Sequence, residues 1–200
     1  MHVHPLAVRI AHWVNAIALT CMTMSGWGIY NASPIFRFSF PAWSTLGAWL
    51  GGAIAWHFAA MWLLVVNGLF YVIYGLASGH LRRQFLPLRG REIARDALLA
   101  LRGRLSHRAG AYNAVQRLLY VVVLLLGGLV VVSGLSIWKP VQFAGLTELF
   151  GGFDTAHTVH FIAMAGIVGF VVIHLALVII VPRTLLPMVT GRVHRGATSS

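Results

Sequence analysis

The sequence predicts an all-α integral membrane protein, a four-helix bundle with both chain termini in the cytoplasm. Three observations support this prediction. Of the 200 residues, 58% are hydrophobic and only 10% are charged, whereas a soluble domain carries about 25% charged residues. Four apolar stretches are long enough to cross a bilayer, which takes about 20 helical residues. Nearly all cationic residues lie in one set of the connections between these stretches.

The four apolar stretches cover roughly residues 10–30, 49–76, 118–138 and 157–181. Within lipid, only helices and closed barrels satisfy their backbone hydrogen bonds. The stretches lack the alternation of apolar and polar residues that is typical of a strand, so we predict that they are helices. No internal repeat is evident in the sequence. We expect one transmembrane domain over residues 1–200, ending in a disordered tail over residues 191–200.

The cationic residues predict the orientation. The segment between the second and third stretches carries nine arginines, the N-terminal segment carries Arg9, and the C-terminal segment carries three more. The opposite side has only Arg37 and Lys139. Cytoplasmic loops of membrane proteins carry an excess of Lys and Arg, so we expect a bacterial inner-membrane protein with both termini inside. The net charge of +11 then reflects this bias at the lipid surface, and no nucleic-acid partner is expected.

Two of the connections have a pattern of their own. In residues 91–105, apolar side chains fall on one helical face and charged side chains on the opposite face, which is typical of a helix lying on the membrane surface. Residues 31–47, on the outer side, contain Phe36, Phe38, Phe40 and Trp43. This aromatic segment fits either a belt at the membrane interface or a docking surface for a periplasmic partner.

Histidines within the apolar stretches are the main functional signal, because ionisable side chains inside a membrane are costly. Four of the ten histidines lie there, His12, His57, His160 and His174, and His157 lies at the outer edge of the fourth stretch. In a helix, His160 and His174 fall within about 40° of one face and about 21 Å apart along the axis. His157 is about 100° out of line with His174. We therefore prefer His160 to His157 as a functional residue.

Depth in the membrane pairs the four histidines. His12 and His174 lie near the cytoplasmic surface, and His57 and His160 lie in the outer half. Two such bis-imidazole pairs can hold two haems stacked across the bilayer. A bare metal site needs converging ligands such as carboxylates or thiolates, and the apolar stretches contain no carboxylate. The alternative is that these histidines only form hydrogen bonds between helices.

Accessory residues agree with haem binding. Arg9 lies one helical turn from His12, where a guanidinium can pair with a haem propionate. Glycines are frequent in the apolar stretches, among them Gly26, Gly28, Gly134 and Gly166. They allow either the approach of a flat macrocycle or close packing between helices.

These features resemble the prokaryotic four-helix cytochrome b family, which includes bacterial cytochrome b561 and the membrane subunits of nickel–iron hydrogenase, formate dehydrogenase and thiosulfate reductase. The resemblance rests on Arg9–Trp13, on Trp56–His57 and on the segment from His160 to His174. It implies that His12, His57, His160 and His174 are the axial ligands of two b-type haems. It also implies a quinone pool and a periplasmic redox enzyme as partners, with molybdenum and nickel–iron enzymes as the candidates.

A second match precedes the third apolar stretch. Residues 112–117 resemble the segment of the formate dehydrogenase membrane subunit that lines its cytoplasmic-side quinone pocket, with Val115 here in place of a glycine. The resemblance implies that Asn113 and Gln116 bind the quinone. Taken by themselves, the two side chains fit helix capping and solvation at the interface.

The expected function is electron transfer across the membrane between a periplasmic oxidoreductase and quinone, with the inner haem facing the quinone. No nucleophile or proton-transfer cluster lies in the apolar stretches, so no catalytic residue is expected. One alternative is a stand-alone cytochrome b561 that oxidises superoxide and reduces quinone. Another is a membrane anchor or assembly protein that binds no haem.

Overall fold

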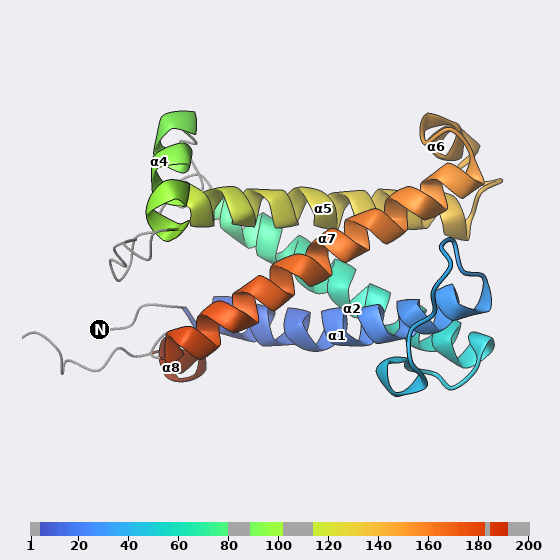
Figure 1. Cartoon of the computed structure of the whole chain (residues 1–200), viewed down its shortest axis with the longest axis horizontal. Helices are drawn as coiled ribbons and strands as arrows, with labels where there is room; N and C mark the ends of the chain where they lie inside the picture. The colour runs from blue at the N-terminus through green and yellow to red at the C-terminus, as the bar shows by residue number, and fades with distance from the viewer. Residues whose placement is uncertain (1–4, 80–88, 102–113, 183–184, 192–200) are drawn as a thin grey trace, which may run out of the picture. The chain divides into compact units, whose positions relative to one another are not determined.

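The computed structural model describes residues 5–79, 89–101, 114–182 and 185–191, which form helices, turns and loops with no strand among them. Four helices of this part of the chain are long and apolar enough to cross a membrane, which confirms the predicted all-α fold. They are α1 (Leu6–Ala32), α2 (Leu50–Ala77), α5 (Ala114–Trp138) and α7 (Phe153–Ile180). The shorter helices are η1 (Ala42–Ser44), α4 (Gly90–Leu101), α6 (Ala144–Leu149) and α8 (Leu185–Thr190) (Figure 1).

The chain divides into two compact units. The first unit comprises Met1–Ile73 and Ala176–Ser200, and the second comprises Tyr74–Leu175. The first unit contains α1, η1, α8 and nearly all of α2, and the second contains α4, α5, α6 and most of α7. Each unit is therefore organised around one pair of long helices.

In the first unit, α1 and α2 run antiparallel and contact each other near both ends. Toward the start of α1, Asn67 Nδ2 donates hydrogen bonds to Ala11 O (2.7 Å) and Asn15 Oδ1 (2.8 Å). Toward the end of α1, a Cβ placed on Gly28 would lie 3.0 Å from Ala53 Cβ. Gly28 therefore serves close helix packing, one of the two predicted roles of the glycines.

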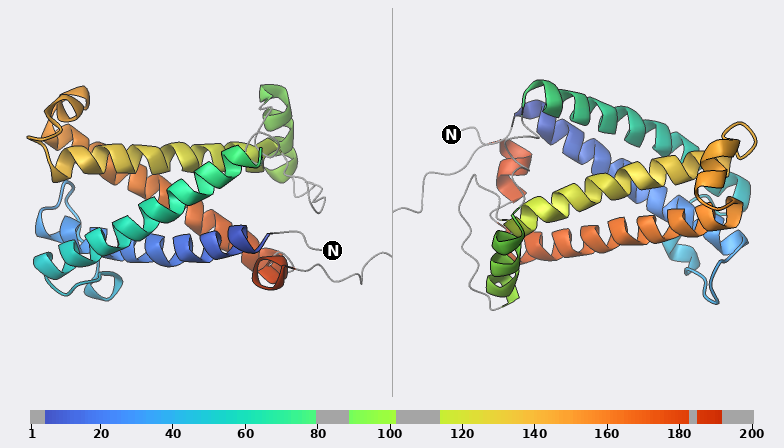
Figure 2. Two further views of the ribbon diagram at one scale, coloured as in Figure 1. Left: turned by 180° about the vertical axis from the view of Figure 1, so that it is seen from behind. Right: turned by 90° about the horizontal axis from the view of Figure 1, so that it is seen from above.

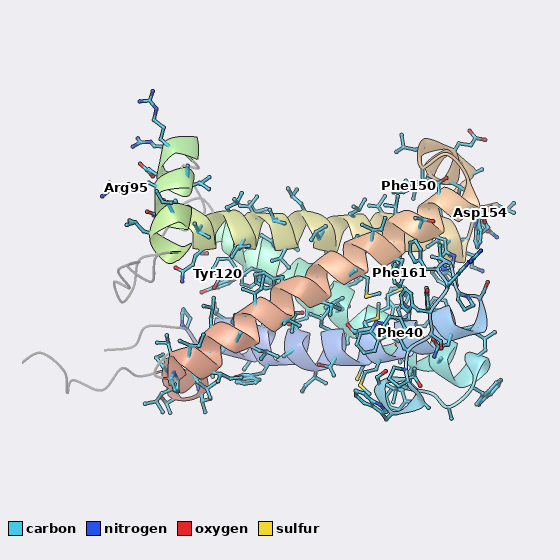
Figure 3. The ribbon with its side chains drawn as sticks, in the orientation of Figure 1. Phe40, Arg95, Tyr120, Phe150, Asp154 and Phe161 are labelled. Atoms are coloured by element: carbon cyan, nitrogen blue, oxygen red, sulfur yellow. The ribbon has the colours of Figure 1, made fainter. Side chains whose placement is uncertain are left out.

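The connection between α1 and α2 folds back on the last turns of α1. Asn31 exchanges two hydrogen bonds of 2.8 Å with the backbone of Phe40. The ring of Phe40, labelled in Figure 3, stacks on Trp27 with centroids 4.5 Å apart, and meets Tyr30 edge-on at 5.3 Å. Much of the aromatic segment thus packs against the protein itself, while Trp43 is 84% exposed.

In the second unit, α5 and α7 also run antiparallel. A Cβ on Gly166 of α7 would lie 3.0 Å from a methyl carbon of Leu126 on α5, so Gly166 also marks close helix packing. The amide N–H of Ala114, at the start of α5, donates to Asp96 Oδ2 of α4 at 2.9 Å, which satisfies one of the N–H groups that a helix start leaves without a partner. Figures 1 and 2 show α4 lying across this start of α5, with α6 at the other end.

Helix α4 covers most of the predicted surface helix at 91–105. Its exposed residues include Arg91 and Arg95, and Arg95 extends from α4 in Figure 3. Residues 102–105 of the predicted surface helix lie outside the described residues, as do residues 192–200 of the predicted tail.

The long helices bury little of their surface inside the protein. In the most apolar window of α1, α2 and α7, 11% of the residues are buried, and in that of α5, 6%. Large side chains such as Leu125 and Ile179 are 69% and 77% exposed. Apolar surface of this extent is typical of faces that contact lipid or another protein, as expected for a multi-pass membrane protein.

Candidate functional site

His57 is held by α1 in the first unit. Its Nδ1 lies 3.1 Å from the Oγ of Ser25, a serine with no solvent exposure. The imidazole also hydrogen-bonds the backbone of Met22. The residue after this serine is Gly26, and a Cβ placed there would lie 3.5 Å from Cε1 of the His57 ring. Two adjacent residues of α1, a serine and a glycine, therefore position this imidazole.

His160 has the same surroundings in the second unit. Its Nδ1 lies 3.1 Å from the Oγ of Ser133 on α5, and Ser133 also has no solvent exposure. The next residue is Gly134, and a Cβ placed there would lie 3.2 Å from Cε1 of the His160 ring. Gly26 and Gly134 thus provide room for an imidazole, a role different from the two predicted for the glycines.

The two units therefore share one arrangement of a histidine, a serine and a glycine. In each unit, one long helix carries a Ser-Gly pair near its end, and the returning helix carries the histidine. His57 lies seven residues after Leu50, the first residue of α2, and His160 lies seven residues after Phe153, the first residue of α7. The two histidines are consequently at the same depth along their own helices.

His12 and His174 have aromatic neighbours. The His12 ring meets Trp13 edge-on with centroids 5.4 Å apart. The His174 ring stacks on Phe170, with centroids 6.1 Å apart and an angle of 10° between the planes. His12 lies six residues after Leu6, where α1 begins, and His174 lies six residues before Ile180, where α7 ends.

Arg9 contacts α8. Its Nε donates to Met188 O at 3.2 Å, and its Nη2 donates to Val189 O. Trp13 Nε1 also donates to Met188 O, at 3.4 Å. These carbonyls belong to the last turn of α8, which a helix leaves without internal partners. The predicted cation near His12 therefore also fixes the end of a short helix.

The predicted quinone residues lie partly outside the described residues. Asn113 is among those not described, whereas Gln116 lies in the first turn of α5 and is half-buried. Beside it, Arg117 Nε is buried and has no hydrogen-bond partner within the described part of the chain. One turn further, the ring of Tyr120 (labelled in Figure 3) lies 6.3 Å from that of Phe170. Phe170 in turn stacks on His174, so the start of α5 leads through aromatic rings to a candidate ligand.

Within its own unit, each of two imidazoles fits the role of an axial haem ligand. His57 and His160 are each held at Nδ1 by a buried side chain. Histidine ligands in proteins usually have their other ring nitrogen fixed in this way. The contact made by His157 is of a different kind, with an aromatic ring of its own helix: the ring of Phe153, one turn earlier, lies 6.2 Å away.

Comparison with known proteins identifies related sequences. The sequence profile of the family described as prokaryotic cytochrome b561 matches residues 3–191. A protein of Azospira oryzae that carries the name of a protein-methionine-sulfoxide reductase subunit, YedZ1, is 50% identical over 190 residues, which cover 94% of this chain and 96% of that protein. Proteins of Cupriavidus necator and Bradyrhizobium diazoefficiens, both named as Ni/Fe-hydrogenase B-type cytochrome subunits, are 25% and 24% identical. These two alignments cover 86% and 88% of this chain and 76% of each relative.

Proposed function

The chain belongs to the prokaryotic cytochrome b561 family, and we propose that this membrane cytochrome carries electrons across the bilayer through two b-type haems. The observation that carries the proposal is the depth of the four histidines along helices of membrane length. His57 and His160 each lie seven residues from the end of their helix that is proposed to face outward. His12 and His174 each lie six residues from the end of their helix that is proposed to face inward. We assign the first pair to an outer haem and the second to an inner haem.

The continuity of α7 supports this assignment. It is one α-helix from Phe153 to Ile180, so His160 and His174 share a face and lie about 21 Å apart along the axis. Bound haem supplies a one-electron iron couple whose potential depends on the axial ligands, burial and hydrogen bonds around it. The chain's own part is to hold four imidazoles at two depths and to exclude water around them.

The distribution of charge supports the proposed orientation. We propose that both termini face the cytoplasm and that the protein lies in the bacterial inner membrane, because 13 of its 15 Lys and Arg residues belong to the segments on that side. In this orientation α4 lies on the inner surface with Arg91 and Arg95 exposed. Lys139, on the outer side, lies over the ring of Trp138 at 5.4 Å.

Arg9 supports the inner haem. A guanidinium has five N–H donors, and the contacts with Met188 and Val189 engage two of its nitrogens. The proposal assigns donors beyond those two contacts to a propionate of the haem held by His12. In this role Arg9 joins the haem edge to α8.

We propose that quinone binds beside the start of α5, next to the inner haem. Gln116 and Asn113 can donate amide hydrogen bonds to a quinone carbonyl. The buried Nε of Arg117, without a partner in the described part of the chain, supplies a further donor. The rings of Tyr120, Phe170 and His174 are in succession, which offers a short path between this position and the inner haem.

The proposed partner is a periplasmic oxidoreductase, and the relative with 50% identity favours the catalytic subunit of a protein-methionine-sulfoxide reductase. In that case quinol releases two electrons and two protons, and reduction of a sulfoxide consumes two of each and forms a thioether and water. Electrons would then pass from the inner to the outer haem, one at a time. The exposed Trp43 and Trp49, both in the connection before α2, lie on the proposed partner side.

A haem assay and a quinol assay test the proposal. The purified protein should contain about two b-type haems per chain by pyridine haemochrome, and a quinol analogue should reduce both. Reoxidation should require the partner and its sulfoxide substrate. A haem content near zero would favour the membrane anchor, and rapid reduction by superoxide without a partner would favour the stand-alone enzyme.

A further inference from the structure

We infer that Ser25 and Ser133 are positioning residues that fix His57 and His160 as Nδ1–H tautomers, so that both present Nε2 to the iron of the outer haem. The inference rests on the proposed function, which assigns these two histidines to one haem. It adds two residues, one in each unit, that act on the haem through its ligands.

The donor and acceptor roles at Ser25 follow from its hydrogen bonds. A serine hydroxyl has one proton and two lone pairs. Ser25 Oγ lies 2.6 Å from Cys21 O, a carbonyl that can only accept, so the hydroxyl proton is directed there. The Oγ must then accept from His57 Nδ1 at 3.1 Å.

Ser133 repeats these roles in the second unit. Its Oγ lies 2.6 Å from Leu129 O and 3.1 Å from His160 Nδ1. The hydroxyl proton is again directed to the carbonyl four residues earlier, and the imidazole donates. A neutral imidazole is protonated on only one nitrogen, so protonation at Nδ1 places the lone pair on Nε2 in both histidines.

The burial of both serines makes this arrangement persistent. Ser25 and Ser133 are the same distance from their carbonyls and from their histidines, and neither is exposed to solvent. Water therefore does not compete for either hydroxyl. The glycine after each serine leaves room for the ring, so the Ser-Gly pair determines both the tautomer and the position of each ligand.

The arrangement has a consequence for the haem potential. A hydrogen bond donated by Nδ1–H makes a histidine ligand more basic, which favours ferric over ferrous iron. Only the part of this interaction that differs between ferric and ferrous iron changes the potential, and the whole bond, worth at most about tenfold in an equilibrium constant, is its upper limit. At 59 mV per tenfold change for one electron, either serine-to-alanine change should raise the outer-haem potential by no more than about 60 mV.

The test is redox titration of the full-length protein in detergent, followed by haem absorbance and by electron paramagnetic resonance of the low-spin ferric haems. Ser25→Ala and Ser133→Ala should each raise the potential of the same haem and leave the other unchanged. The double variant should raise it further. Ser25→Thr and Ser133→Thr keep a hydroxyl and should restore the potential, which a purely structural role of the serines does not require.

Two matched controls accompany these variants. Ser136 is also unexposed and lies on α5, but its Oγ donates to Ser133 O. Thr20 lies on α1 and its Oγ1 donates to Ala16 O, four residues earlier. Ser136→Ala and Thr20→Ala should leave both potentials unchanged.

Each outcome of the titration is decisive. Unchanged potentials in both alanine variants, with two haems present, would overturn the inference and leave the proposed function intact. Shifts of two different haems would overturn the assignment of both serines to one haem. A wild-type protein without haem would instead overturn the proposed function itself. Loss of one haem in an alanine variant and its recovery in the threonine variant would support the inference.

Discussion

Replacing Gly134 by alanine should disturb the His160 ring. The added Cβ would lie 3.2 Å from Cε1 and 3.5 Å from Nδ1 of that ring, so the ring must move by a few tenths of an ångström. Overpacking of this kind typically costs about 1–3 kcal/mol. Alanine regains about 1 kcal/mol over glycine within a helix. The expected net loss of stability is therefore about 0–2 kcal/mol.

Gly128→Ala is the matched control on the same helix. A Cβ at Gly128 meets no atom of the described chain within 4 Å, so this variant has the gain in helix propensity without the overpacking. The difference between the two variants should therefore equal the overpacking cost of about 1–3 kcal/mol. At about 2–4 °C per kcal/mol for a chain of this length, Gly134→Ala should unfold roughly 2–12 °C below Gly128→Ala.

The assay is thermal unfolding in detergent followed by far-ultraviolet circular dichroism, with haem spectra taken on the same samples. Gly134→Ala should also change the spectrum of one haem, because a shift of the His160 ring alters its hydrogen bond to Ser133. Gly26→Ala provides a graded comparison, since its Cβ would lie 3.5 Å from the His57 ring, an ordinary contact. Equal unfolding temperatures and identical spectra for Gly134→Ala and Gly128→Ala would refute the reasoning.

Three further predictions concern the ligands, the quinone and the first helix pair. His160→Ala should abolish one low-spin haem signal in electron paramagnetic resonance, whereas His157→Ala should retain both; the reverse result would contradict the choice of ligand on α7. Asn113→Ala should weaken a quinone-analogue inhibitor of haem reoxidation by about 2- to 12-fold with both haems intact, and unchanged inhibition would place the quinone elsewhere. Asn67→Leu removes two hydrogen bonds from α2 to α1 and should cost about 1 kcal/mol of stability, since such bonds in membranes contribute about 0.6 kcal/mol each on average. Unfolding at the wild-type temperature would show that these bonds contribute nothing.

The sequence determined the membrane-length helices because hydropathy is a local property of the chain. Each predicted stretch overlaps one long helix, although α1 begins at Leu6 and α5 at Ala114, four residues earlier than predicted in both cases. Polar residues such as Arg9 and Gln116 occupy these added turns. They lower the mean hydropathy there, so the apolar stretch begins later than the helix. The histidines were found for a related reason, since an imidazole in an apolar run is conspicuous whatever its neighbours are.

Only the tertiary structure decided which side chains meet. Ser25 and Ser133 are unremarkable in the sequence, because a serine in an apolar helix satisfies its hydroxyl with the carbonyl four residues earlier. Both serines do make that bond. Their contacts with His57 and His160 span 32 and 27 residues and depend on which helix faces pack together. The Ser-Gly dipeptide that recurs near the ends of the first and third apolar stretches is the signal that could have revealed them.

The same distinction applies to Arg9 and to the aromatic connection. The sequence predicted a cation near His12, but its bonds to Met188 and Val189 depend on where α8 lies, about 180 residues along the chain. The sequence also identified the aromatic segment, whereas the stacking of Phe40 on Trp27 depends on how the connection turns back on α1. Composition and periodicity determine which segments enter the membrane, because transfer from water to lipid is a property of each segment alone. Side-chain partners are determined by packing between segments, which only the folded chain specifies.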